Sequence, residues 1–184
     1  METVRDLADG LASSGSTPNN MITVVYLESY GKGICGKAGK AYSTTQRSYR
    51  MFDVMEMHFD AFTAMLDLPP EEISLWRERG GQPFVSEARL CELSGIWGVS
   101  LTPRLNHINW NGDTIPKGII EMYDALVAML PRTMAAIDES TTGGKAEGVV
   151  VRSAERSTIA KIKFRDYERS FSGPQGPNLT KRGN

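Results

Sequence analysis

The sequence has few cysteines, no long apolar run and almost no net charge, and each absence excludes a class of protein. Its two cysteines, Cys35 and Cys91, form no Cys-x-x-Cys pair, so neither a disulfide framework nor a zinc site is predicted. No hydrophobic stretch approaches the length of a membrane span. The formal net charge of −1 provides no general basic field, so any affinity for nucleic acid must come from local clusters.

The first residues carry Glu2, Asp6 and Asp9 in place of an apolar segment, which argues against a secretory signal and predicts a cytoplasmic location. The two histidines, His58 and His107, lack metal-ligand spacing and are interpreted as surface or packing residues. A chain of 184 residues with average composition can form one domain with a sizeable core.

Periodicity predicts a mixed α+β chain with strands around the chemically interesting segments and helices between them. Pro69-Pro70 and Gly80-Gly81 break the charged region 69–82, which is predicted to be a surface excursion. Helices are expected at residues 2–12, 87–93 (capped by Ser86 and ended by Gly95) and 117–129, and strands at 22–27, 50–55, 98–101, 147–152 and 159–164.

The most informative stretch is residues 146–164, AEGVVVRSAERSTIAKIKF. Alternation predicts two strands joined by a polar loop, with Glu147 at the entrance of the first strand. In the second strand Lys161 and Lys163 would point to one face and Ile162 to the other. Two ammonium groups fixed on one strand face suit phosphate oxygens, and a nearby carboxylate can hold a divalent metal over the same phosphates.

The order of motifs resembles that of the covalent nucleotidyltransferases, the superfamily of ATP-dependent DNA ligases, RNA ligases and capping enzymes. Their last two motifs, EGxVxK/R and KxK, are matched by EGVVVR and AKIKF. Upstream, VVYLESYG is similar to the third motif and SYRMFDV to the aromatic motif that follows it. KGICGKAGKAYS and FRDYERSF resemble the phage and bacterial RNA ligase branch, so the resemblance spans residues 23–171.

The resemblance implies an α+β nucleotidyltransferase (ATP-grasp-like) ligase fold, with antiparallel sheets flanked by helices and the nucleotide between them. It implies ATP and Mg²⁺ as cofactors, and RNA with a 5′-phosphate and a 3′-hydroxyl as the substrate of a repair reaction. The implied site residues are Lys161 and Lys163 for the nucleotide phosphates, Glu147 for the metal, Glu28 for the ribose and Tyr49 for stacking on adenine. Of these, the two lysines and Glu147 form the implied catalytic set.

Each residue also has a plainer interpretation. Lysines commonly protect an exposed sheet edge from aggregation. A strand-end carboxylate such as Glu147, or a strand carboxylate such as Glu28, can simply face solvent. Tyr49 and Phe52 could both pack in the core, and Phe52 is the ring predicted to do so, although it could instead be the stacking ring.

The family's nucleophile, the lysine of a KxDG or KxNG motif, has no counterpart here. Residues 1–22 contain no lysine, and Lys32, Lys37 and Lys40 follow the third motif without starting either sequence. The expectation is therefore a partial RNA ligase adenylyltransferase domain at 1–171 that lacks its N-terminal part, followed by a disordered tail at 172–184. The alternative is a non-catalytic nucleotide- or RNA-binding remnant, or half of a split ligase completed by a separate polypeptide that supplies the lysine.

Overall fold

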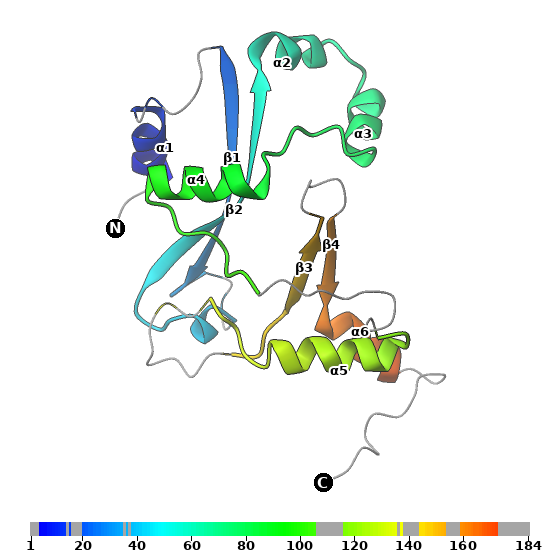
Figure 1. Cartoon of the computed structure of the whole chain (residues 1–184). Helices are drawn as coiled ribbons and strands as arrows, with labels where there is room; N and C mark the ends of the chain where they lie inside the picture. The colour runs from blue at the N-terminus through cyan, green and yellow to red at the C-terminus, as the bar shows by residue number, and fades with distance from the viewer. Residues whose placement is uncertain are drawn as a thin grey trace. The chain divides into compact units, whose positions relative to one another are not determined.

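A computed structural model describes residues 4–13, 15, 20–34, 36, 38–105, 116–135, 137, 144–153 and 159–172 (Figure 1). The chain is α+β: the described strands form two separate antiparallel sheets of two strands each, β1–β2 and β3–β4. The elements in order are α1 (Val4–Ser13), β1 (Met21–Gly31), the 3-10 turn η1 (Ala38–Ala41), β2 (Arg47–His58), α2 (Phe59–Leu66), α3 (Pro70–Glu78), α4 (Glu87–Trp97), α5 (Ile119–Met129), β3 (Gly148–Arg152), β4 (Ile159–Lys163) and α6 (Phe164–Ser172).

The chain divides into two compact units. The first, unit 1, contains Met1–Ser29, Tyr49–Thr102 and Arg152–Thr158, and the second, unit 2, contains Tyr30–Ser48, Pro103–Val151 and Ile159–Asn184. No helix in the described ranges is long and apolar enough to cross a membrane. The expected loop residues 154–158 and the expected tail, apart from Ser172 at the end of α6, lie outside the described residues, as do Cys35 and His107.

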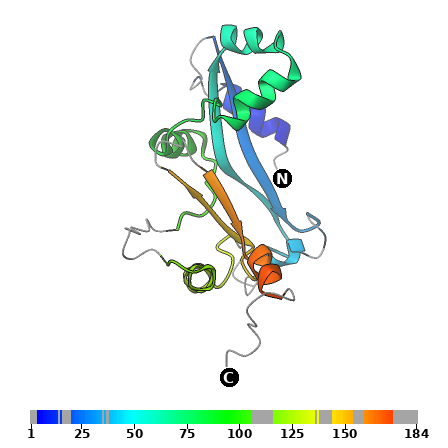
Figure 2. The ribbon, with the colours of Figure 1, turned by 90° about the vertical axis from the view of Figure 1, so that its right-hand side faces the viewer.

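In unit 1 the core lies against β2, which has partners along both of its edges. β1 pairs with one edge, as Figure 2 shows. Residues 100–102 run parallel to the other edge at Met51, and residues 83–85 run antiparallel to it at Met55. The buried side chains of this core cluster are Met51, Val54, Val85, Leu90, Leu93 and Val99. A two-stranded hairpin alone is marginally stable, so these additional partners and the core support β1–β2.

A β-bulge interrupts β2 between Met51 and Val54. In a regular strand, alternate residues bond toward the same edge. Met51 bonds Ser100 and Thr102 across the outer edge, but farther along the strand Val54 and then Glu56 face that edge, bonding residues 85 and 83. The change from odd to even positions requires one extra residue, and Asp53, Val54 and Met55 are accordingly buried in succession.

Helix α4 begins where the sequence predicts and ends later. Ser86 is its N-cap and accepts a hydrogen bond from the backbone N–H of Arg89 at 3.3 Å, which confirms the predicted cap. The prediction that Gly95 ends the helix is wrong, because the helix continues to Trp97 and Gly98 is its C-cap. Gly98 has a φ of 64°, the left-handed conformation that a helix C-cap favours, whereas Gly95 is tolerated inside the helix.

The region 69–82 lies at the surface, as the sequence predicts, but α3, which was not predicted, occupies much of it. Pro70 stands at the first helical position, where its fixed φ suits a helix and its missing N–H costs nothing. Glu71 and Glu72 follow in the first turn, where carboxylates favour the positive end of the helix dipole. Reading Pro69-Pro70 only as a break in secondary structure therefore missed the start of α3.

In unit 2, α5 and α6 pack with the β3–β4 hairpin around Leu126, Ala146, Val149 and Phe164. The predicted helix at 117–129 is confirmed, beginning at Ile119. Helix α6 was not predicted; it starts directly after β4 and turns its aromatic side to α5. The contacting rings are Tyr123–Phe164, Tyr123–Tyr167, Tyr123–Phe171 and Tyr167–Phe171, with centroid separations of 5.5–6.1 Å.

Candidate functional site

The β3–β4 hairpin brings three of the expected site residues onto one small element. The backbone N–H of Phe164 donates to the carbonyl of Glu147 at 3.0 Å, which sets the two strands in register. At the next residue, Gly148, φ is 155° and an added Cβ would overlap the carbonyl oxygen of Ile162 and lie 2.9 Å from Cα of Lys163. Only glycine fits this close approach, so the Glu-Gly pair of EGVVVR has a structural basis.

The lysine pair of β4 lies on the solvent side of the hairpin. Lys161 and Lys163 are exposed, whereas Ile162 between them is half-buried and packs against the unit 2 core. The predicted alternation is confirmed. Among the described residues neither lysine forms an ion pair, so both ammonium groups are available to an anion.

Glu147 is exposed immediately before β3. Within the described ranges, no three or more His, Cys, Asp or Glu side chains are grouped so that they could hold a metal. A preformed protein cage for Mg²⁺ is therefore absent from those ranges. A single carboxylate still fits Mg²⁺ in the manner typical of nucleotide enzymes, in which one or two carboxylates share the ion with substrate phosphates and water.

A third lysine of unit 2 is engaged, unlike the pair on β4. The Lys145 ammonium donates to Oε1 of Glu168, and the Tyr123 hydroxyl donates to the same oxygen, the latter at 2.8 Å. The hydrogen bond from Lys145, followed by that from Tyr123, lowers the pKa of Glu168. Burial, followed by the bond to Glu168, raises the pKa of Tyr123 to about 12. This cluster joins α5, α6 and the segment before β3.

The two expected nucleoside contacts lie in unit 1. Glu28 is exposed on β1. Tyr49 is half-buried and packs against the core cluster of unit 1. The prediction that Phe52 would be the packing ring is wrong: Phe52 is 38% exposed and lies beside Tyr26, with ring centroids 6.0 Å apart. Alternation along β2 explains the exchange, because Tyr49 shares the side of the buried Met51 and Phe52 points the other way.

Arg152, the last residue of EGVVVR, makes the contacts that sequence reasoning missed. Its guanidinium donates to the carbonyl of Phe52 at 3.1 Å, lies 3.9 Å from Oδ2 of Asp53, and is 3.3 Å from Oε2 of Glu87. Asp53 Oδ1 also accepts a hydrogen bond from the backbone N–H of Val54 at 3.0 Å. Arg152 thus holds the bulge of β2, and no local pattern could indicate a partner 100 residues away.

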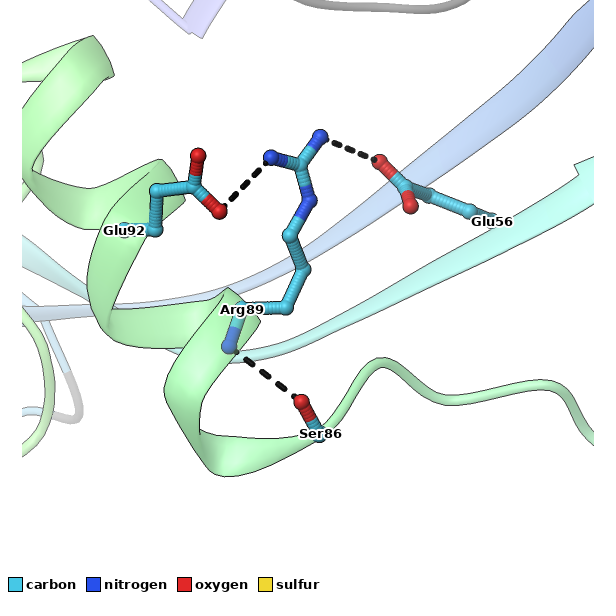
Figure 3. A network of polar contacts seen from close by, with 4 residues as sticks. All are labelled: Glu56, Ser86, Arg89 and Glu92. Atoms are coloured by element: carbon cyan, nitrogen blue, oxygen red, sulfur yellow. Dashed lines mark hydrogen bonds and ion pairs between the residues drawn. The ribbon is translucent and has the colours of Figure 1, made fainter.

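A second arginine in unit 1 connects α4 to β2 (Figure 3). The Arg89 guanidinium bonds Glu92 at 2.9 Å and Glu56 at 3.4 Å. The hydrogen bond to Glu92 is the main cause that raises the pKa of Arg89. Both carboxylates are already paired with this arginine, so we interpret the cluster as a structural connection.

Comparison with protein families, with curated proteins and with solved structures gave no match. The motifs and the geometry of the β3–β4 hairpin are therefore what indicates a function.

Proposed function

We propose that this chain is an adenylyltransferase domain of the ATP-dependent RNA ligase type, acting on RNA 5′-phosphate and 3′-hydroxyl ends. The observation that carries the proposal is the β3–β4 hairpin. Its two exposed lysines share one strand face. Gly148, which follows Glu147 directly, is required by the close approach of β3 to the backbone of β4. The sequence resemblance assigns phosphate and metal contacts to the same three residues.

The lysine pair would neutralise the charged phosphates of ATP and of adenylylated RNA. When a nucleophile attacks the α-phosphorus, the bond to the leaving group breaks and negative charge develops on the departing oxygens. Positioned ammonium groups stabilise that charge more in the transition state than in the ground state, which accelerates the reaction. Exposure leaves Lys161 and Lys163 accessible for this role.

Glu147 would hold Mg²⁺ together with the nucleotide phosphates, as its single carboxylate suits. The ion would supply further charge neutralisation and would orient the phosphates for in-line attack. In this assignment Glu147 binds and orients, and it does not transfer a proton.

The resemblance assigns Glu28 and Tyr49 to the nucleoside. The exposed carboxylate of Glu28 can accept a hydrogen bond from a ribose hydroxyl. Tyr49 is the stacking residue that the resemblance implies, but it packs against the core. The more exposed Phe52 is therefore a second candidate for stacking on adenine. Comparing Tyr49→Leu with Phe52→Leu in adenosine binding would assign the ring.

The first 27 residues hold no lysine, so the chain as given is expected to form no lysyl-AMP with ATP and Mg²⁺. Joining of RNA that is already adenylylated does not need that lysine. In this step the 3′-hydroxyl attacks the activated 5′-phosphate, a phosphodiester forms and AMP leaves. We expect this sealing step to depend on the lysine pair.

The test compares Lys161→Ala and Lys163→Ala with Lys117→Ala, a control that removes an exposed lysine from the same unit. Each β4 variant should weaken binding of ATP with Mg²⁺ about tenfold or more, because a charge-assisted phosphate contact contributes roughly 1.5–3 kcal/mol. The control should bind as the unchanged chain does. Equal affinity in all three variants would reject the phosphate-binding assignment.

A sealing assay with pre-adenylylated RNA separates the two candidate functions. Product that is lost in the Lys161→Ala and Lys163→Ala variants supports the ligase. ATP binding that needs both lysines, without any sealing, instead supports the non-catalytic nucleotide-binding alternative, which the missing KxDG or KxNG lysine favours. A stable adenylate on the purified chain would show that another lysine serves as the nucleophile.

A further inference from the structure

Helices α2 and α3 follow β2 one after the other in unit 1 (Figure 1), and neither helix has a buried residue. They are eight and nine residues long, which is too short for stability in isolation. Helices of this length are normally held by burying one face. In these two helices the apolar side chains of Phe62, Met65, Ile73 and Trp76 are only half-buried, and the remaining ones are exposed.

The exposed surface is apolar. On α2, Phe59 and Leu66 are 49% and 65% exposed, and helical spacing places both on the same side as the half-buried Phe62. Leu68 in the connection and Leu75 on α3 are 38% and 43% exposed. Single exposed apolar residues are ordinary, but four within one helix pair indicate an interaction surface.

The ends of both helices are well defined, so the exposure of these apolar side chains is not a consequence of fraying. His58 caps α2, its Nδ1 accepting from the backbone N–H of Asp60 at 3.3 Å. At the end of α3, the backbone N–H of Gly81 donates to the carbonyl of Trp76 at 2.9 Å, and the Trp76 ring lies over Gly81. The pair therefore presents a formed surface.

The charges beside this surface indicate which kind of partner could bind there. Between residues 59 and 79, carboxylates outnumber guanidiniums five to two. The carboxylates are Asp60, Asp67, Glu71, Glu72 and Glu78. An acidic border repels nucleic acid and anionic lipid, and two copies meeting through this face would place like charges together. A basic partner would be attracted by the border and could cover the apolar side chains.

We propose that α2 and α3 form a docking surface for a basic amphipathic helix of a partner protein. Leu66, Phe59 and Phe62 contact the apolar face of that helix, and the carboxylates pair with the lysines or arginines that flank it. This helix-on-helix mode is a recurrent form of peptide recognition. The inference does not rest on the proposed ligase function.

The probe for the test is a synthetic helical peptide with leucines at helical spacing and flanking lysines, labelled with a fluorophore. The matched peptide carries glutamates in place of the lysines. Fluorescence anisotropy with the full chain should detect binding of the basic peptide, and binding of the acidic one should be at least about tenfold weaker. Equal binding of the two peptides would overturn the charge argument.

Variants of the chain locate the site. Phe59→Ser and Leu66→Ser should each weaken binding of the basic peptide by about tenfold, because each removes a large apolar contact. Ile96→Ser is the control: Ile96 is 50% exposed on α4, outside the surface. All three positions are exposed, and unchanged thermal midpoints would show that the variants remain folded.

Three results would overturn the proposal. The first is equal loss of peptide binding in Leu66→Ser and Ile96→Ser, which indicates nonspecific apolar adhesion. The second is a dimer in sedimentation that Leu66→Ser dissociates, which assigns the face to a second copy of the chain. The third is an RNA oligonucleotide that competes with the peptide for this face.

Discussion

The two β-hairpins in the described part of the chain differ in length, in pairing and in what they expose. The β1–β2 hairpin has strands of 11 and 12 residues, and β2 has backbone partners on both edges and a buried core against it. The β3–β4 hairpin has five-residue strands, and its second strand presents two lysines to solvent. Long, doubly paired strands can enclose a core, whereas a short hairpin packed on one face leaves the other free for charge.

The polar residues divide in the same way. In unit 1, Arg152 and Arg89 are occupied by backbone and carboxylate partners that hold β2, its bulge and α4. In unit 2, Lys145 is similarly occupied, but Lys161 and Lys163 have no ion pair among the described residues. Occupied cations are structural, and available cations are the ones expected to bind a ligand.

The largest effect on stability is expected at Gly148, where the β3–β4 hairpin has no room for a side chain. Gly148→Ala should destabilise unit 2 by about 3 kcal/mol, because the added methyl group meets the backbone of β4 and φ is unfavourable for alanine. Gly95→Ala is the control, since nothing lies within 4 Å of its added Cβ and alanine favours a helix. Urea denaturation of both variants measures the difference; an unchanged midpoint for Gly148→Ala would contradict the predicted strand approach.

A smaller loss of stability is expected when Arg152 is removed from the bulge of β2. Arg152→Ala should cost about 2 kcal/mol, because Asp53 is buried and would lose the cation that faces its carboxylate. Asp53→Asn together with Arg152→Ala should recover part of that loss, since no buried carboxylate then remains. Denaturation of the single and double variants tests this coupling, and strictly additive losses would argue against it.

The contribution of the Lys145–Glu168–Tyr123 cluster to stability should depend on pH. Tyr123→Phe removes one hydrogen bond to a carboxylate and should cost about 1 kcal/mol near neutral pH. The pKa of Tyr123 rises in the folded chain from 10.0 to about 12. Its contribution is therefore complete below pH 10 and is lost as the pH rises through 12, so the gap between variant and unchanged chain should close there. A gap that stays constant through this range would contradict the raised pKa of Tyr123.

The smallest effect on stability is expected at the lysine pair. Lys161→Ala and Lys163→Ala should each change the free energy of unfolding by less than about 0.5 kcal/mol, because both side chains are exposed. The same variants are expected to lose phosphate binding. If either variant unfolds the hairpin, the separation between occupied and available cations is wrong, and hydrogen exchange of β3 and β4 would show it.

Local patterns predicted much of the hairpin and parts of the helices. Alternation in AKIKF predicted the exposure of both lysines, and the N-capping preference of serine predicted the start of α4 at Ser86. The same kind of reasoning failed at Gly95 and at the proline pair 69–70, because glycine is tolerated within a helix and proline can begin one. Helix α6 escaped prediction because its charged residues obscured the aromatic side that faces α5.

The sequence by itself determined the features that depend on neighbours along the chain: strand alternation, helix starts, and a Glu-Gly pair followed by a Lys-x-Lys strand. Tertiary structure alone decided which ring packs in the core, where β2 bulges, and that Arg152 serves Asp53 and the carbonyl of Phe52. These outcomes depend on strand register and on partners remote in sequence. Two alternative registers differ by one residue and exchange every side chain between faces, so the packed core selects between them.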